Sequence, residues 1–203
     1  MSGILFIVSA PSGAGKTSLV ATLIKAEPAV GLSVSHTTRA PRDSEVDGRD
    51  YHFVTAPAFE CMLEQGAFLE SATIYGHQYG TSQQWVTDQL AAGWDIVLEI
   101  DWQGAQQVRR KMGQDTVNIF VLPPSLDALG ERLRSRSQDP PEVIARRLAA
   151  AREEISHFVE FDYVIMNDDF DRAAQDLASI VRAERLRLRR QLARHADSIN
   201  RMK

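Results

Sequence analysis

The chain has 203 residues, a formal net charge of −4, a hydrophobic content of 44% and a single cysteine. These values fit one large domain, or a core with small insertions, and they exclude a disulfide framework and a cysteine-based metal site. No apolar run approaches the ~20 residues that span a membrane, and no basic segment precedes the first apolar one, so we expect a cytoplasmic protein without a signal peptide.

The first informative motif is Ala-Pro-Ser-Gly-Ala-Gly-Lys-Thr at residues 10–17, directly after the apolar segment Leu5–Ser9. This is the layout of a phosphate-binding loop between a buried strand and a helix, here expected over Lys16–Ala26. The glycines allow successive N–H groups to point at phosphates, while the lysine and threonine suit the outer phosphates and Mg²⁺. The usual motif begins with glycine, whereas position 10 is alanine. The alternative, a glycine-rich turn with a surface lysine, does not explain why the motif follows an apolar strand.

Five short apolar segments predict the strands of a buried parallel sheet, which need not alternate polar and apolar residues. They are Leu5–Ser9, Leu32–Ser35, Ile96–Ile100, Val117–Leu122 and Tyr163–Met166. Helical patterns at Lys16–Ala26, Ser82–Ala92 and Asp171–Leu192 separate most of them. Cys61 falls in a further helical pattern, where we expect a core or boundary position. The alternation of strands and helices predicts an α/β fold with helices on both faces of the sheet.

Two stretches interrupt this alternation. Residues 37–79 contain strand-like pieces at Tyr51–Val54 and Phe68–Tyr75 and a helix expected after Pro57, so they predict an inserted α+β lobe. Residues 125–158 predict two arginine-rich helices that are broken at Asp139–Pro141 and form a mobile lid. We therefore divide the chain into a core of residues 1–34 and 83–124 with a C-terminal segment 159–203, a lobe of residues 35–82 and a lid of residues 125–158.

Charged residues mark three candidate sites. Glu99 and Asp101 end an apolar strand and are expected to share one of its faces near the phosphate loop. Either one of them holds the Mg²⁺ shell while the other meets a second ligand, or both are solvated carboxylates. Arg39 and Arg42 lie beside hydroxyl residues and suit a phosphate monoester, although a basic surface turn has the same composition. The lid carries Arg132, Arg136, Arg146 and Arg147, which either stabilise a transferring phosphoryl group or form salt bridges on a solvated helix.

The C-terminal tail from Arg182 to Lys203 holds eight basic residues against two acidic ones. Such a tail can contact nucleic acid, but it lacks interleaved aromatic residues. We expect instead a solvated helix that packs through Leu186, Leu188 and Leu192.

Together these residues resemble the guanylate kinases of the nucleoside monophosphate kinase superfamily, close to the bacterial forms. The segments that carry the resemblance are residues 33–42, 48–53, 79–81, 99–104 and 164–169. The resemblance implies a P-loop NTPase fold with a five-stranded parallel sheet, a GMP-binding lobe and a helical lid. It also implies a cytoplasmic enzyme of purine metabolism that transfers the γ-phosphoryl group of ATP to GMP, with Mg²⁺.

The resemblance further implies roles for individual residues. GMP would be held by Ser35, Arg39, Arg42, Tyr51, Glu70, Tyr79, Gly80, Thr81 and Asp101. ATP would be held by Ala10, Pro11, Ser12, Gly13, Ala14, Gly15, Lys16, Thr17, Ser18 and Asn167, with Asn167 near the adenine. Lys16, Arg132, Arg136 and Arg147 would act in catalysis, and Thr17 and Glu99 would hold the metal. A carboxylate such as Glu70 can accept both N1–H and N2–H₂ of guanine, whereas adenine would leave it unpaired.

Three rival functions stay open at this point. They are a kinase for another nucleotide, a non-catalytic peptide-binding domain, and a nucleic-acid binder that uses the basic tail. We expect no membrane and no nucleic acid as partners, and the sequence allows a homo-oligomer.

Overall fold

The computed structural model describes residues 3–74, 76–136 and 141–202, without the side chains of residues 114, 136 and 141. Its centre is a parallel sheet in the order β2-β7-β1-β8-β9. The strands are β1 (Leu5–Ser9), β2 (Val30–Leu32), β7 (Asp95–Glu99), β8 (Thr116–Leu122) and β9 (Tyr163–Met166). All five residues of β1 are buried, as expected for a central strand covered on both faces. The predicted α/β fold is therefore confirmed.

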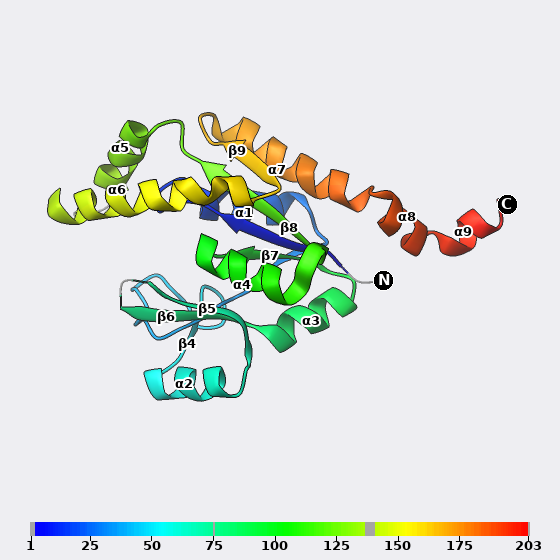
Figure 1. The fold of residues 1–203 in the computed structure, drawn as a ribbon, viewed down its shortest axis with the longest axis horizontal. Coiled ribbons are helices and arrows are strands. Elements are labelled where there is room, and N and C mark those ends of the chain that lie inside the picture. Colours follow the sequence, from blue (N-terminus) through cyan, green and yellow to red (C-terminus); the bar gives the residue numbers. More distant parts are fainter. Residues whose placement is uncertain (1–2, 75, 137–140, 203) are drawn as a thin grey trace.

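Helices cover the two faces of this sheet (Figure 1). One apolar cluster joins the sheet to α1 (Lys16–Ala26) and α7 (Phe170–Arg185), and a second joins it to α3 (Gln83–Ala91) and α4 (Trp102–Met112). A short turn of 3₁₀ helix, η1 (Gly113–Asp115), connects α4 to β8. The sequence patterns did not predict α4, whose buried residues Ala105 and Val108 are flanked by polar side chains.

The inserted lobe is built on a second, smaller sheet in the order β4-β3-β6-β5. Its strands are β3 (His36–Thr37), β4 (His52–Phe53), β5 (Phe68–Ile74) and β6 (His77–Ser82), and its helix is α2 (Ala56–Glu64). Phe59 of α2 stacks on Phe68 of β5 with ring centroids 4.5 Å apart. Cys61 of α2 is exposed, so the expected core or boundary position is wrong.

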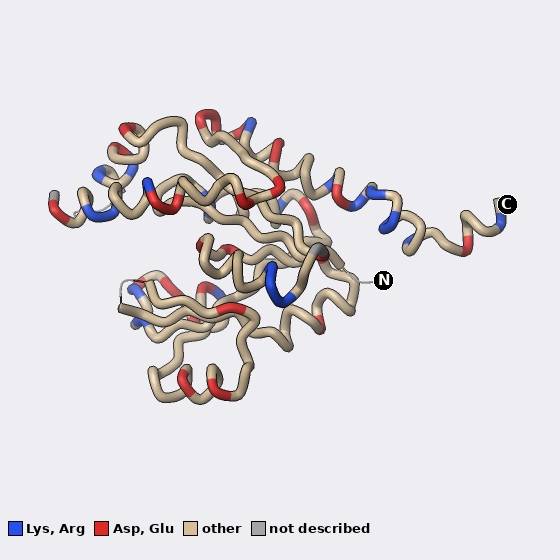
Figure 2. Tube along the Cα trace, in the orientation of Figure 1, with Lys and Arg blue, Asp and Glu red and all other residues tan. Residues whose placement is uncertain are grey.

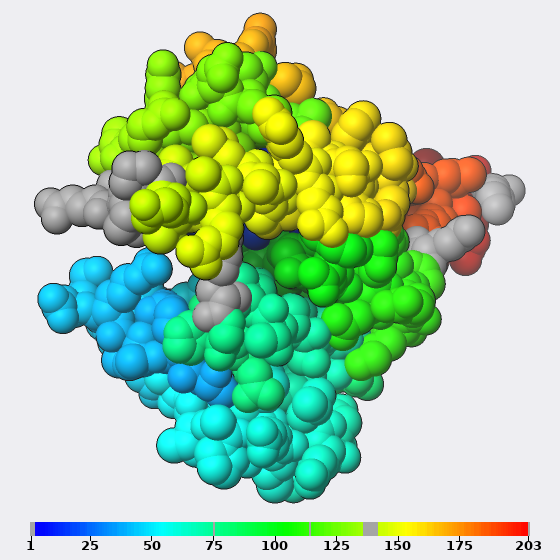
Figure 3. Space-filling model, turned by 60° about the vertical axis from the view of Figure 1, so that its left-hand side comes forward, coloured from blue at the N-terminus to red at the C-terminus, as the bar shows by residue number. Residues whose placement is uncertain are grey.

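The lid consists of α5 (Leu126–Arg136), α6 (Pro141–Ser156) and the 3₁₀ turn η2 (His157–Glu160). Leu129, Leu133, Ile144 and Ala151 form a small core between the two helices. Residues 139 and 140 of the expected hinge lie outside the described residues. The space-filling view shows the lid above the inserted lobe, with a hollow between them (Figure 3).

The C-terminal tail differs from the prediction of one packed helix over Asp171–Leu192. Helix α7 ends at Arg185, and α8 (Leu188–Arg194) and α9 (Ala196–Asn200) extend away from the body (Figure 1). Leu186, Leu188 and Leu192 are 69%, 74% and 43% exposed, so the expected packing through these leucines is wrong. The tail is rich in basic residues (Figure 2), and its first arginines are anchored to the core by ion pairs rather than by apolar contact: Arg182 with Glu27 and Arg185 with Asp95, each at 2.7 Å.

Two smaller expectations are also corrected. The strand expected at Leu32–Ser35 lies earlier, as β2 at Val30–Leu32, and the chain then leaves the central sheet for the inserted lobe. Asp101 does not continue the strand beside Glu99. It follows β7 as the N-cap of α4 and accepts a hydrogen bond from the Gly104 N–H at 2.8 Å. No described helix is long and apolar enough to cross a membrane.

Candidate active site

The phosphate loop connects the carboxyl end of β1 to the amino end of α1. Gly13 and Gly15 have φ angles of 93° and 95°, which explains why the loop needs glycine at both positions. A Cβ on Gly15 would lie 2.5 Å from Nδ2 of Asn167. By contrast, Ala10 is buried in the apolar core at the start of the loop, so alanine fits there.

Asn167 supports the loop from behind. Its side chain is buried, and Nδ2 donates to the Ala14 carbonyl oxygen at 2.7 Å. The backbone carbonyl oxygen of Asn167 accepts from Nη2 of Arg132 at 3.0 Å. Within this structure Asn167 therefore positions the loop, and its predicted contact with adenine stays a prediction. The remaining loop residues lie where the motif predicts, with Pro11 buried and Ser18 exposed in the first turn of α1.

Lys16, Thr17 and Glu99 meet where β1 and β7 end side by side. Nζ of Lys16 donates to the Ile100 carbonyl oxygen at 3.2 Å, and Oγ1 of Thr17 donates to Oε1 of Glu99 at 2.5 Å. A hydroxyl and a carboxylate thus stand together beside the phosphate loop. Both are hard oxygen ligands of the kind that Mg²⁺ prefers.

The basic segment of the inserted lobe forms a side-chain cluster. Both Oε atoms of Glu45 accept from Nη2 of Arg39 at 2.8 Å, and the Arg39 guanidinium lies over the Tyr51 ring at 5.4 Å from its centroid. Tyr79 packs edge-on against Tyr51, and its hydroxyl also contacts Arg39. Arg42 is exposed and lies near the same Glu45 carboxylate. Ser35 is half-buried just before β3. The structure therefore brings Arg39, Arg42, Tyr51 and Tyr79 together, with Glu45 as a partner that the sequence analysis missed.

A buried carboxylate lies deeper in the same lobe. Glu70 on β5 is only 3% exposed, and its Oε1 accepts from Oγ1 of the buried Thr81 at 2.5 Å. Burial, helped by the nearby negative charge of Asp101, raises the pKa of Glu70 to about 7, although the hydrogen bond from Thr81 opposes this shift. Gly104 lets α4 approach this carboxylate, since an added Cβ would lie 2.7 Å from Oε2. Gly80 is likewise packed against the Phe68 ring.

The lid helix α6 contacts the phosphate loop. Nη2 of Arg147 donates to Oγ of Ser12 in the phosphate loop at 2.9 Å. Glu154, two helical turns later on the same face, is half-buried. Burial, together with the negative charge of Asp101, raises its pKa. The positive charge of Lys16 and the hydrogen bond from the Ser12 N–H act in the opposite direction. Glu154 therefore lies near Lys16 and Ser12 of the phosphate loop and near Asp101 at the start of α4. The side chain of Arg136 lies outside the described part, and Arg146 is exposed.

Sequence reasoning missed Glu154 because it lies among charged residues on an amphipathic helix. The available signal was its spacing of seven residues from Arg147, which places both on one helix face. Burial also raises the pKa of Tyr51, with smaller contributions from Tyr79 and from Glu99 across the hollow. Tyr51 of the inserted lobe therefore lies close enough to Glu99 for their charges to interact.

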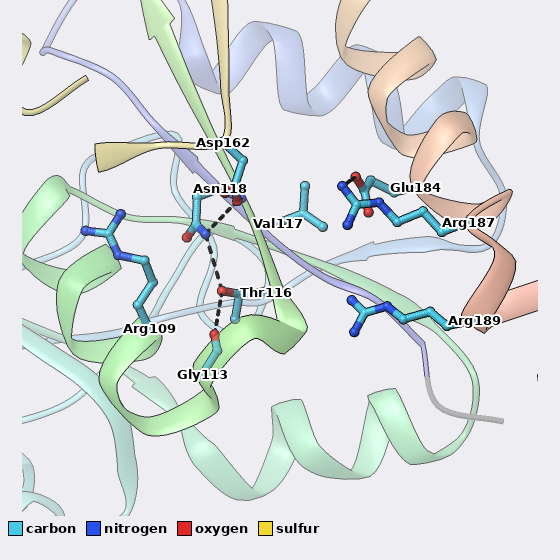
Figure 4. Close-up of a pocket in the computed structure, with 9 residues that line it drawn as sticks. All are labelled: Arg109, Gly113, Thr116, Val117, Asn118, Asp162, Glu184, Arg187 and Arg189. Atoms are coloured by element: carbon cyan, nitrogen blue, oxygen red, sulfur yellow. Dashed lines mark hydrogen bonds and ion pairs between the residues drawn. The ribbon is translucent and has the colours of Figure 1, made fainter. Parts of the chain in front are cut away.

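A separate pocket of about 290 Å³ lies at the amino ends of β8 and β9, away from the phosphate loop (Figure 4). It is lined by the first residues of β8 and by arginines that include Arg187 and Arg189, and it contains none of the predicted site residues. Within the described chain, Oδ1 of Asn118 and Oε2 of Glu184 are buried there without a protein partner. A polar hollow of this kind suits ordered water rather than the reaction.

Comparison with known proteins agrees with this geometry. The family model described as guanylate kinase matches residues 2–184. A guanylate kinase from Thiobacillus denitrificans is 60% identical over 194 residues, which cover 96% of this chain and 92% of that protein. One from Methylobacillus flagellatus is 56% identical over 202 residues and the full length of both chains. The crystal structure of guanylate kinase from Anaplasma phagocytophilum superposes with a TM-score of 0.75 at 34% identity, covering 93% of this chain and 89% of that one.

Proposed function

The chain belongs to the guanylate kinase family, the ATP:GMP phosphotransferases, and we propose that the site described above transfers the γ-phosphoryl group of ATP reversibly to GMP or dGMP. The observation that carries this assignment of the site is the buried Glu70–Thr81 pair. It lies in the lobe whose Tyr51 is near Glu99, and Glu99 stands beside the phosphate loop. We place the reaction in cytoplasmic purine nucleotide metabolism, supported by the bacterial relatives.

The donor half is the loop from Ala10 to Ser18. Its N–H groups and the positive end of α1 bind the ATP phosphates, and Lys16 neutralises the charge that develops on the transferring group. Arg132 and Arg147 add positive charge from the lid, and Arg136 is assigned to the same task from its place in the sequence. Because both reactants are anions, positioning and charge neutralisation supply most of the catalysis.

The acceptor half reads both ends of GMP. Arg39 and Arg42, with Tyr51, Tyr79 and Ser35, hold the phosphate and present one of its oxygens in line with the γ-phosphorus. Glu70, Thr81 and Asp101 read the base beside the backbone of Gly80. An ionised Glu70 accepts from N1–H and N2–H₂ of guanine, which gives selectivity over adenine.

Thr17 and Glu99 fit a Mg²⁺ ion that is bound together with ATP. Mg²⁺ keeps several waters and commonly uses only one or two protein oxygens besides the phosphates, so a hydroxyl and a carboxylate that already touch form a suitable pair. When held by Thr17 and Glu99, the ion would supply positive charge that offsets the negative charge of the ATP phosphates. Closure of the lid over the hollow then excludes water, which would otherwise accept the phosphoryl group.

An assay of ADP release with GMP, dGMP, AMP, UMP and CMP, each with and without Mg²⁺, tests this proposal. We expect rapid, Mg²⁺-dependent turnover with GMP and dGMP. Faster turnover with AMP would overturn the base assignment, and a lack of phosphoryl transfer at high enzyme concentration would favour the peptide-binding alternative. Steeply salt-dependent binding of DNA or RNA that is lost on deleting residues 185–203 would favour the nucleic-acid binder.

A further inference from the structure

Helix α4 has contacts on two opposite sides that the reaction itself does not require. Residues 102, 106 and 109 form one stripe at helical spacing, and residues 104, 107 and 111 form another on the far side. Between them, Ala105 and Val108 are buried against the sheet. The first stripe meets the end of the lid, and the second meets the inserted lobe.

The lid side is a connected cluster of ring and charge contacts. The Trp102 ring stacks on the His157 ring of η2, with centroids 3.5 Å apart and an angle of 9° between the planes. Glu160 accepts from Nη2 of Arg109 at 2.6 Å and from Nε2 of Gln106 at 3.0 Å, and its Oε1 lies 2.6 Å from Nδ1 of His157. These contacts, with that of His157 the largest, lower the pKa of Glu160 to about 2. The carboxylate therefore stays ionised over the working range of pH.

On the side that faces the inserted lobe, side chains of α4 form hydrogen bonds with backbone groups of β5. Oε1 of Gln107 accepts from the Ser71 N–H at 3.1 Å, and its Nε2 donates to the Ser71 carbonyl oxygen at 2.8 Å. Nζ of Lys111 donates to the Phe68 carbonyl oxygen at 2.8 Å. These anchors flank Glu70 on the same strand, and Gly104 packs directly against the Glu70 carboxylate.

We propose that α4 links the GMP site to the lid, with Trp102, Gln107 and His157 as positioning residues through which bound GMP favours the lid geometry that binds ATP. Bound GMP fixes the side chains of Glu70, which lies against the side of α4, and of Asp101, which is the N-cap of α4. The helix then holds η2, the end of the lid, against the core. Since linkage is reciprocal, ATP must increase the affinity for GMP by the same factor. This inference rests on the proposed function.

The test is calorimetric titration of the full chain with Mg²⁺ and the β,γ-imido analogue of ATP, with and without saturating GMP. The ratio of the two analogue affinities is the coupling factor, which we expect to be about 5-fold or more in the unmodified protein. His157→Ala and Gln107→Ala should each reduce this factor below about 2-fold while leaving the affinity for either ligand alone within about 2-fold. Gln103→Ala, on the exposed side of the same helix, is the matched control and should keep the full factor.

The double variant provides a further test. If both contacts belong to one link, His157→Ala combined with Gln107→Ala lowers the factor no more than either change alone, since the link is already broken. Gln106→Ala, which removes the two hydrogen bonds from Nε2 to the Glu160 carboxylate, replaces His157→Ala if circular dichroism shows that the latter is unfolded. Variants that keep the full factor, or an unmodified protein with a factor of 1, would overturn the link. Failure of the unmodified protein to bind GMP or the analogue would instead contradict the proposed function.

Discussion

The proposed donor and acceptor sites of this chain are built in opposite ways. The phosphate loop is made of backbone groups, and its shape is fixed by two glycines with positive φ and by the buried amide of Asn167. The acceptor site is made of side chains, and its principal arginine, Arg39, is already paired with Glu45. The donor site is therefore preformed, whereas phosphate binding at the acceptor site must compete with an existing ion pair.

This difference predicts how each site responds to mutation. A preformed backbone site depends on the few charges added to it, so losing one charge affects the rate and leaves recognition of the acceptor intact. A side-chain site depends on the identity of each residue, so a conservative change there alters selectivity. The predictions below test this distinction.

The largest effect is expected at the donor site. Lys16→Met should lower kcat about 10³-fold, because we propose that this ammonium group neutralises the transferring phosphoryl group. The affinity for GMP, measured by calorimetry, should change little. If kcat fell by less than about tenfold, or if the affinity for GMP fell by the same factor as kcat, the separation of the two sites would be contradicted.

The next effect concerns the acceptor base. Glu70→Gln should lower kcat/KM for GMP about 100-fold, because an amide cannot accept from both N1–H and N2–H₂ and presents its own donor to the base. The selectivity for GMP over IMP, which lacks the 2-amino group, should shrink in parallel, while the affinity for ATP alone stays constant. Equal losses with GMP and IMP would show that Glu70 does not read the 2-amino group.

The same contrast explains what the sequence could predict. Strand β1, the loop and α1 agree with the prediction to the residue, because glycine spacing and a continuous apolar run are local signals. The partners of Arg39 and the role of Glu154 could not be predicted, since they depend on side chains that meet only in the folded chain. Helix α4 was missed because its short apolar stripe faces the sheet while polar side chains bind the two neighbouring parts. The tail leucines suggested an apolar contact between the tail and the core. The structure instead joins the two through the ion pairs of Arg182 and Arg185.

A smaller effect should appear in the pH dependence of acceptor binding. Because burial raises the pKa of Glu70 to about 7, the group is largely neutral below this pH and gains its second acceptor oxygen above it. KM for GMP should therefore fall about 10-fold between pH 6 and 8. The phosphate of GMP also ionises near a pKa of about 6. Glu70→Gln is therefore the control, because it keeps the pH dependence that comes from the phosphate and loses the part that comes from Glu70.

The same shift has a consequence for stability. The folded chain retains the Glu70 proton to a higher pH than the unfolded chain does, so ionisation disfavours the folded state. The stability contributed by the neutral carboxyl is present at low pH and is lost as pH rises from the ordinary glutamate value towards about 7. The free energy of unfolding of Glu70→Gln, measured by denaturant titration, should not show this decline with pH. If the unmodified protein and Glu70→Gln gave the same pH profile, the decline would come from other groups.

The smallest effect is expected where the two sites meet. Glu154 places a negative charge near Lys16 and the Ser12 N–H, where the outer phosphates of ATP are proposed to bind. Glu154→Gln should therefore strengthen ATP binding, and about 3- to 10-fold is reasonable for a half-buried charge. The neighbouring Glu153 is exposed, so Glu153→Gln is a matched control that removes the same charge without the contact. Equal changes in both variants would indicate only a general effect of net charge. Weaker ATP binding in Glu154→Gln would show that this carboxylate orients the loop, and the donor site would then depend on side-chain identity as the acceptor site does.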